Sequence, residues 1–168
     1  ELAANILAGQ GGRLFLDLRD QKSLAYSVGA SQTPNICGGV FTLYIATATH
    51  KTKDALFGLK HHIETLAKIP PSIEELERAK QSVLGARRIE SQHVSYQTSQ
   101  LAMSDAYGLG FDNFLKFDER VKNVTPESIS SVLKSLLEQN PPVIAGVGSP
   151  AAWFPEKTND DLLLWNVR

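Results

Sequence analysis

The apolar residues of this chain change from a strand-like to a helical spacing at about residue 52. Every second residue from Phe41 to Ile45 is large and apolar, which is typical of a strand whose two faces have different surroundings. After Thr52 the large apolar residues recur at intervals of three and four, as in an amphipathic helix, until Pro70 and Pro71. Strands and helices are therefore segregated along the chain, which favours an α+β fold over an alternating parallel sheet.

Two strands are expected, over residues 25–30 and 40–49. Residues 33–35, closed by Gly38 and Gly39, have the composition of a turn or loop. A loop this short joins antiparallel strands, so the two strands are expected to pair in that way. Before them, the sequence predicts helices over 1–8 and 12–21, separated by a glycine-rich break.

Helices dominate the second half of the predicted fold. Ser72 and Glu75 have the spacing of a capping box, which predicts a helix running to about residue 91. Thr125 followed by Pro126 is an N-cap with proline at the first helical position. Further elements are expected as helices over 95–107, 113–121 and 126–140, and as a short buried strand over 143–147. The predicted fold is α+β, with an antiparallel-rich sheet and helices packed on one face.

Length and charge restrict the classes of protein to consider. The 168 residues fit one domain, predicted over 1–148, followed by a tail or linker over 149–168. A net charge of −1, with both signs mixed along the chain, argues against nucleic-acid binding. The sequence has no apolar run of about 18 residues, so no membrane span is expected. Cys37 is the single cysteine, which excludes an internal disulfide and fits cytoplasm or periplasm alike.

The chain also reads as a piece of a longer polypeptide. It lacks an initiator methionine, and its only methionine is Met103. The apolar residues Leu2, Ile6 and Leu7 look like a helix entered partway. We therefore expect an N-terminally truncated fragment whose function is shared with segments outside this sequence.

Arg19 and Tyr26 are the candidate site residues. They lie seven positions apart, one at the end of a predicted helix and the other in the first predicted strand. A guanidinium offers five donors in a planar fork, and a phenol offers a neutral donor, a combination that suits a peptide carbonyl or a developing oxyanion. Taken singly, each is better explained as an ordinary surface arginine or a packed strand aromatic. A substrate-holding role is favoured for the pair only within the longer signature that surrounds it.

The surrounding residues resemble the non-zinc, C-terminal domains of pitrilysin/insulinase zinc metallopeptidases. The resemblance begins with Gly-Arg-Leu-Phe at 12–15, Leu-Arg at 18–19 and Leu-Ala-Tyr-Ser-Val at 24–28. It continues in order through residues 39–41, 44–45, 74–80, 107–108 and 124–127, and so spans roughly 1–148. Relatives usually carry glycine where this chain has Ser23. The resemblance implies that Arg19 and Tyr26 hold the substrate near the scissile bond, and that the partners are a zinc-bearing domain and a peptide.

No metal is assigned to this chain. In the resembled family, the zinc motif is histidine-x-x-glutamate-histidine, in which two imidazoles one helical turn apart share the ion. The nearest match here is His61-His62-Ile63-Glu64, followed by Thr65. Adjacent residues on a helix point about 100° apart, so His61 and His62 are not placed to share one metal. The resemblance implies that zinc lies in a partner domain or subunit.

Two further functions remain compatible with these residues. The first is a non-catalytic scaffold, like the core subunits of respiratory complexes that share this fold. The second is a peptide-binding subunit without chemistry of its own. A zinc motif upstream, or in a co-encoded partner, would favour the peptidase. Whichever of these functions applies, this fragment alone is expected to have no catalytic activity.

Overall fold

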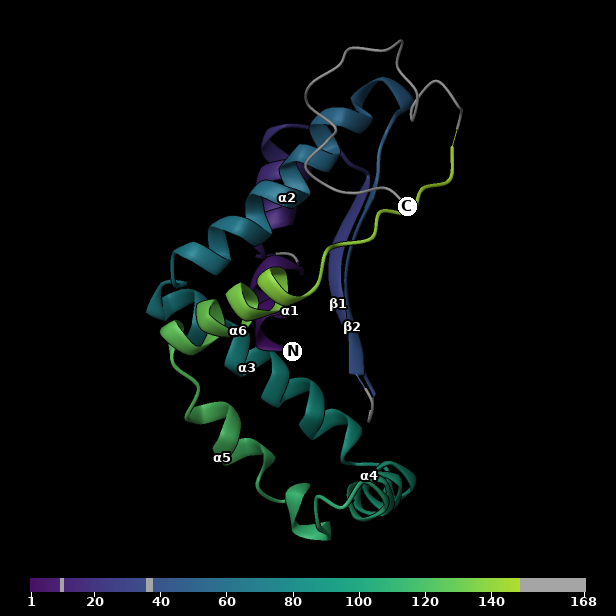
Figure 1. The fold of residues 1–168 in the computed structure, drawn as a ribbon. Coiled ribbons are helices and arrows are strands. Elements are labelled where there is room, and N and C mark those ends of the chain that lie inside the picture. The colour runs from purple at the N-terminus through teal and green to yellow at the C-terminus, as the bar shows by residue number, and fades with distance from the viewer. Residues whose placement is uncertain (10, 36–37, 149–168) are drawn as a thin grey trace.

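The computed structural model describes residues 1–9, 11–35 and 38–148 as a helical layer on one side of a long β-hairpin (Figure 1). The predicted fold class, α+β with helices packed on one face of an antiparallel sheet, is confirmed. The elements in chain order are α1 (Leu2–Leu7), η1 (Phe15–Gln21), β1 (Ser27–Asn35), β2 (Gly38–Ala46), η2 (Thr49–Lys51), α2 (Thr52–Lys68), α3 (Ile73–Glu90), α4 (Val94–Ala106), η3 (Phe111–Asn113), α5 (Phe117–Lys122) and α6 (Pro126–Gln139).

The hairpin is longer than the sequence predicted. Strands β1 and β2 pair antiparallel from Ser27 opposite Ala46 to Asn35 opposite Gly38. Residues 33–35, expected as a loop, are therefore part of β1, and that prediction was wrong. Turn composition describes only local preference, whereas pairing with β2 satisfies the backbone of these exposed residues. Pro34 is tolerated there because an edge strand can accommodate a missing N–H. The predicted loop residue Cys37 lies outside the described residues.

The two faces of the hairpin differ as the alternation predicted. Val28, Leu43 and Ile45 are among the partly buried residues of the face that packs against the core. On the opposite face the ring of Tyr44 lies over Gly29, where a Cβ would be only 2.5 Å from Cε1 of the tyrosine. Glycine is therefore needed at this position if the ring is to stay flat on the sheet.

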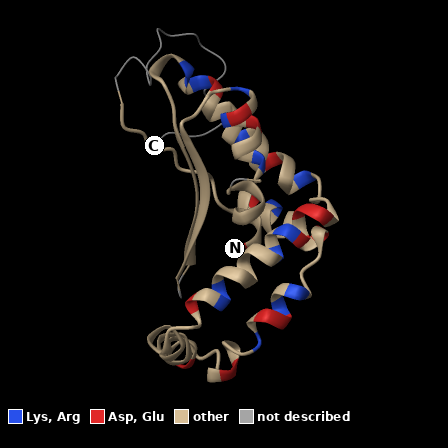
Figure 2. Ribbon diagram, turned by 180° about the vertical axis from the view of Figure 1, so that it is seen from behind, with Lys and Arg blue, Asp and Glu red and all other residues tan. Residues whose placement is uncertain are grey.

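Charged residues are confined to the helical part of the fold. Figure 2 shows lysine, arginine, aspartate and glutamate spread over the helices in mixed order, and both strands free of them. An uncharged hairpin with its charges interspersed elsewhere offers no continuous basic face of the kind that binds nucleic acid. Within the described ranges, no helix is long and apolar enough to cross a membrane.

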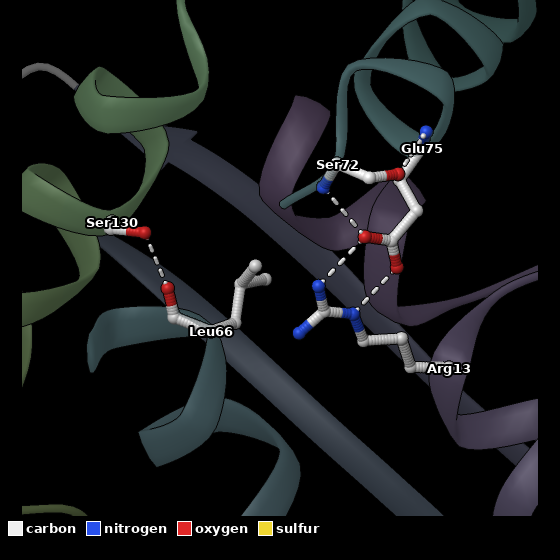
Figure 3. A network of polar contacts seen from close by, with 5 residues as sticks. All are labelled: Arg13, Leu66, Ser72, Glu75 and Ser130. Atoms are coloured by element: carbon white, nitrogen blue, oxygen red, sulfur yellow. Dashed lines mark hydrogen bonds and ion pairs between the residues drawn. The ribbon is translucent and has the colours of Figure 1, made fainter. Parts of the chain in front are cut away.

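The core lies between the hairpin and the helices α1, α2, α3 and α6. Its fully buried large side chains are Leu7, Leu14, Leu18, Leu66 and Leu133. Helices α2 and α6 pack against each other, and the hydroxyl of Ser130 donates to the carbonyl of Leu66 at 2.7 Å (Figure 3). Segment η1 packs tightly onto α2, because a Cβ on Gly58 would lie 2.5 Å from Leu18 Cδ2. This contact fixes the segment that carries Arg19.

The start of α3 is tied to the residues before η1. The predicted capping box is confirmed: Glu75 N donates to Ser72 Oγ at 3.1 Å, and Ser72 N donates to Glu75 Oε2 at 2.9 Å. The same carboxylate accepts two hydrogen bonds from Arg13, at 2.7 and 2.8 Å (Figure 3). The hydrogen bonds from Arg13 lower the pKa of Glu75 from 4.5 to about 2. One side chain therefore caps a helix and joins two distant segments.

The last predicted strand is absent. Residues 143–147 form no strand, and the side chains of Val143 and Val147 are 92% and 106% exposed. An extended apolar segment becomes buried only beside a neighbouring strand, and in the described part of the chain β1 and β2 pair only with each other. The expectation of a buried strand here was wrong for that reason. The helix expected over 113–121 is also shorter, since a separate turn, η3, precedes α5. The predicted tail over 149–168 lies outside the described residues.

Candidate functional site

The site begins with an unusual helical segment. η1 is a π-helix, which has a wider turn than the α-helix expected over 12–21. Lys22 N donates to the carbonyl of Asp17, five residues earlier, at 2.9 Å. Such turns are rare and are frequent at functional sites. Leu14 and Leu18 are fully buried beneath this segment, whereas Arg19 is exposed on it. The buried leucines therefore hold the backbone that presents the guanidinium to solvent.

A tight turn then leads from η1 into β1. Ser23 adopts φ +50°, in the left-handed region that favours glycine, which costs a serine about 1–2 kcal/mol. Two side chains hydrogen-bond to the carbonyls of this turn. Lys51 Nζ donates to Ser23 O at 2.8 Å, and Thr47 Oγ1 donates to Leu24 O at 2.6 Å. The ladder to β2 begins immediately afterwards, where Tyr26 N donates to Ala46 O at 3.2 Å.

Arg19 and Tyr26 lie close together at the end of the hairpin. The guanidinium carbon of Arg19 is 5.8 Å from the centroid of the Tyr26 ring and 4.7 Å from that of Phe15. Tyr26 is 87% exposed, so it is not the packed strand aromatic that a lone tyrosine would suggest. Within the described residues the guanidinium contacts these two rings, and cation–π attraction to the rings orients it. The two candidate side chains therefore lie next to each other and both face solvent at this end of the hairpin.

Both residues line an open hollow of about 690 Å³ between η1, the start of β1 and the end of β2. Its charged residues are Arg19, Lys51 and Asp20, which together carry one net positive charge. Its full lining is Arg19, Asp20, Ser23, Leu24, Ala25, Tyr26, Ala46, Thr47, Ala48 and Lys51. A shallow, weakly positive hollow with exposed donors can bind a polar, uncharged or anionic group such as a peptide carbonyl.

A second polar cluster fixes η1 from the other side. Asp17 accepts from Lys22 at 2.7 Å and lies 2.8 Å from Nε2 of His62 on α2. Burial raises the pKa of Asp17, but the hydrogen bonds from Lys22 and His62 outweigh it and hold that pKa below its ordinary value. The ionised carboxylate thus ties η1 to α2. His62 therefore has a structural role in this cluster.

The histidines do not converge on a metal. His62 is directed to Asp17, whereas His61 stacks on the ring of Phe57 with centroids 6.2 Å apart. Among residues 1–9, 11–35 and 38–148, no group of three or more histidine, cysteine, aspartate or glutamate side chains could hold a metal ion. The side chains that line the hollow offer hydrogen-bond donors and one net positive charge.

Lys51 and Thr47 are the site residues that the sequence did not reveal. Both follow β2, some twenty to thirty residues after the turn that they hold. Their role depends on the pairing register of the hairpin, which brings the end of β2 beside the start of β1. Ser23 is the sequence feature that could have pointed to them. The resembled family usually carries glycine at this position, and a serine there suggests a turn that other side chains must support.

Comparison with known proteins identifies relatives of this chain. Residues 1–83 match the family model described as the peptidase M16 inactive domain. An uncharacterized zinc protease of Rickettsia bellii is 28% identical over 128 residues, which are 76% of this chain and 28% of the relative. The uncharacterized zinc protease YmxG of Bacillus subtilis is 27% identical over 97 residues, or 57% of this chain and 24% of that protein. The chain thus spans less than a third of the length of these curated relatives.

Solved structures agree with the sequence comparison. A peptidase M16 inactive domain from Pseudomonas fluorescens superposes with a TM-score of 0.69 and 25% identity, over 80% of this chain and 32% of that one. An inactive peptidase domain from Bordetella parapertussis gives a TM-score of 0.70 and 26% identity, over 80% of this chain and 73% of that one. The resemblance read from the sequence is confirmed, and the chain is homologous to the inactive, non-zinc domain of the M16 zinc proteases.

Proposed function

We propose that this chain is the substrate-holding domain of a zinc metalloendopeptidase, in which Arg19 and Tyr26 donate hydrogen bonds to the carbonyl of the scissile peptide bond. The observation that carries the proposal is the exposure of Tyr26 beside Arg19 in an open hollow. A tyrosine that is 87% exposed contributes little to the core, so its position calls for a function in contact with another molecule. Homology to the inactive domain of zinc proteases supplies the class of reaction.

Hydrolysis of a peptide bond builds negative charge on the carbonyl oxygen. Donors held in place before the reaction stabilise this charge without reorganising, and they act most strongly where water is excluded. Arg19 provides a charged, bidentate donor and Tyr26 a neutral one. A zinc ion held by a different domain would supply Lewis-acid polarisation and an activated water. The residues of this chain would orient the substrate and bear part of the developing charge.

The proposal requires a second domain on the open side of the hollow. This chain covers less than a third of its curated relatives, so the zinc-bearing partner can lie in the same polypeptide or in a separate subunit. Closure by that domain would remove solvent from Arg19 and Tyr26. An extended peptide held by main-chain hydrogen bonds in the partner would then present its carbonyl to them.

Kinetics of single variants in the complete enzyme test this proposal. Arg19→Ala and Tyr26→Phe should each lower kcat/KM for a peptide by roughly 10²–10³, the usual loss for one oxyanion donor. Zinc content should stay unchanged, because neither residue contacts the metal. Matched controls are Arg88→Ala on α3 and Tyr107→Phe at the C-cap of α4, both at exposed residues. Full turnover in Arg19→Ala and Tyr26→Phe would refute the assignment and would favour the scaffold function.

A further inference from the structure

The turn that carries Tyr26 is held by two side chains in addition to the backbone hydrogen bond from Leu24 N to Leu18 O at 2.7 Å. Ser23 lies at φ +50°, a conformation in which a serine is strained. A turn of this kind persists when surrounding contacts determine it more strongly than the local sequence does. The hydrogen bonds from Lys51 to Ser23 O and from Thr47 to Leu24 O are such contacts.

These two contacts connect the turn to rigid parts of the fold. Lys51 closes the short η2 helix and directly precedes α2, whose residues Leu59, Ile63 and Leu66 are buried in the core. Thr47 follows the last paired residue of β2. A charged ammonium donor makes a stronger hydrogen bond to a carbonyl than a neutral donor does. Through its hydrogen bond to Ser23 O, Lys51 therefore fixes the strained turn relative to α2.

Tyr26 is held through its backbone more than through its ring. Its N–H donates to Ala46 O at 3.2 Å, whereas its ring is 87% exposed, with the guanidinium carbon of Arg19 5.8 Å from the ring centroid. The direction of its side chain therefore depends on the backbone of residues 23–25. A catalytic group displaced by about 1 Å can lose about 10²-fold in rate.

We infer that Lys51 is a positioning residue, which with Thr47 clamps the Ser23–Leu24 turn and so aims the Tyr26 hydroxyl at the substrate. The inference rests on the proposed function, because it concerns how the same site is built. It adds two residues that the family resemblance did not assign in this chain. Lys51 also lines the hollow, so direct contact with the substrate is the competing role that an experiment has to separate.

The experiment is a double-mutant cycle in the complete enzyme. Lys51→Met keeps most of the apolar stem but removes the donor, and it should lower kcat/KM for a peptide by roughly three- to thirtyfold. Lys51→Arg, which can still donate to the carbonyl, should recover most of this loss. Lys53→Met, an exposed lysine two residues further along, is the matched control and should have no effect. In a Tyr26→Phe background, Lys51→Met should cost less than about twofold, since coupled residues are not additive.

A spectroscopic measurement accompanies the kinetics. With 3-fluorotyrosine at position 26 of the complete chain, Lys51→Met should shift or broaden the fluorine resonance, and Lys53→Met should leave it unchanged. Thr47→Val, which has nearly the same shape but no hydroxyl, should act in the same direction as Lys51→Met. These readouts follow the environment of Tyr26 and do not depend on turnover.

The outcomes separate the two proposals. If Tyr26→Phe lowers activity but Lys51→Met changes neither rate nor resonance, the positioning role is refuted and the substrate-holding proposal stands. If Lys51→Met is equally harmful with and without the Tyr26 hydroxyl, Lys51 contacts the substrate directly and the inference is also overturned. If Tyr26→Phe itself has no effect, the proposed function fails first.

Discussion

At the scale of single residues, Glu75 shows how one carboxylate can serve several purposes. It caps α3 through Ser72 and accepts two hydrogen bonds from Arg13, with about a fifth of each charged side chain exposed. These contacts stabilise the ionised form, so the pKa of Glu75 falls to about 2 in the folded chain. The capping box was predictable because it is local. Its pairing with Arg13, 62 residues away, was not.

This carboxylate should make stability depend on pH. The pKa is lower in the folded state than in the unfolded state, so the stabilisation is present above about pH 4.5 and is lost as pH falls toward about 2. The expected loss is on the order of 2–3 kcal/mol. Urea unfolding of the chain at several pH values, followed by circular dichroism, measures it. Glu75→Gln should flatten this part of the profile, and Glu74→Gln, the exposed neighbour, should not. An unchanged slope in Glu75→Gln would show that Arg13 does not hold this carboxylate ionised.

At the scale of elements, local sequence patterns predicted most of the helices, but they predicted the strands only in part. Apolar spacing and two N-caps placed α2, α3 and α6 correctly, because these signals lie within each helix. The extension of β1 through 33–35 depends on pairing with β2, which composition does not report. Residues 143–147 failed as a strand because strand formation requires a neighbour. Helical periodicity likewise did not distinguish the π-helical turn of η1 from an α-helix.

The contact between α2 and α6 should dominate the stability of the helical layer. Leu133 is 1% exposed on α6, whereas its neighbour Val132 is 67% exposed. Leu133→Ala removes buried methyl groups and leaves a cavity, which should cost about 2–5 kcal/mol of unfolding free energy. Val132→Ala should cost less than about 0.5 kcal/mol, as surface changes usually do. Urea unfolding compares the two. Similar losses in both variants would mean that Leu133 is not packed as described.

At the scale of the whole molecule, we propose that the site forms one wall of a larger structure. The sequence predicted Arg19 and Tyr26 because they lie within one continuous signature, and the fold brings them together as expected. It did not predict Lys51 and Thr47, since their contacts with the turn arise only once the hairpin has closed. The matches cover most of this chain but less than a third of its curated relatives, and the proposal places the zinc in a domain outside this chain.

Photochemical cross-linking in the complete enzyme tests the central proposal most directly. With p-benzoylphenylalanine in place of Tyr26 and the catalytic metal removed by chelation, a bound peptide is held without being cleaved. Irradiation should join position 26 to peptide residues adjoining the scissile bond, as located by mass spectrometry. The same probe in place of Tyr107, the C-cap residue of α4, should give no such adduct. An adduct yield at position 26 no greater than at position 107, or adducts far from the scissile bond, would contradict the account.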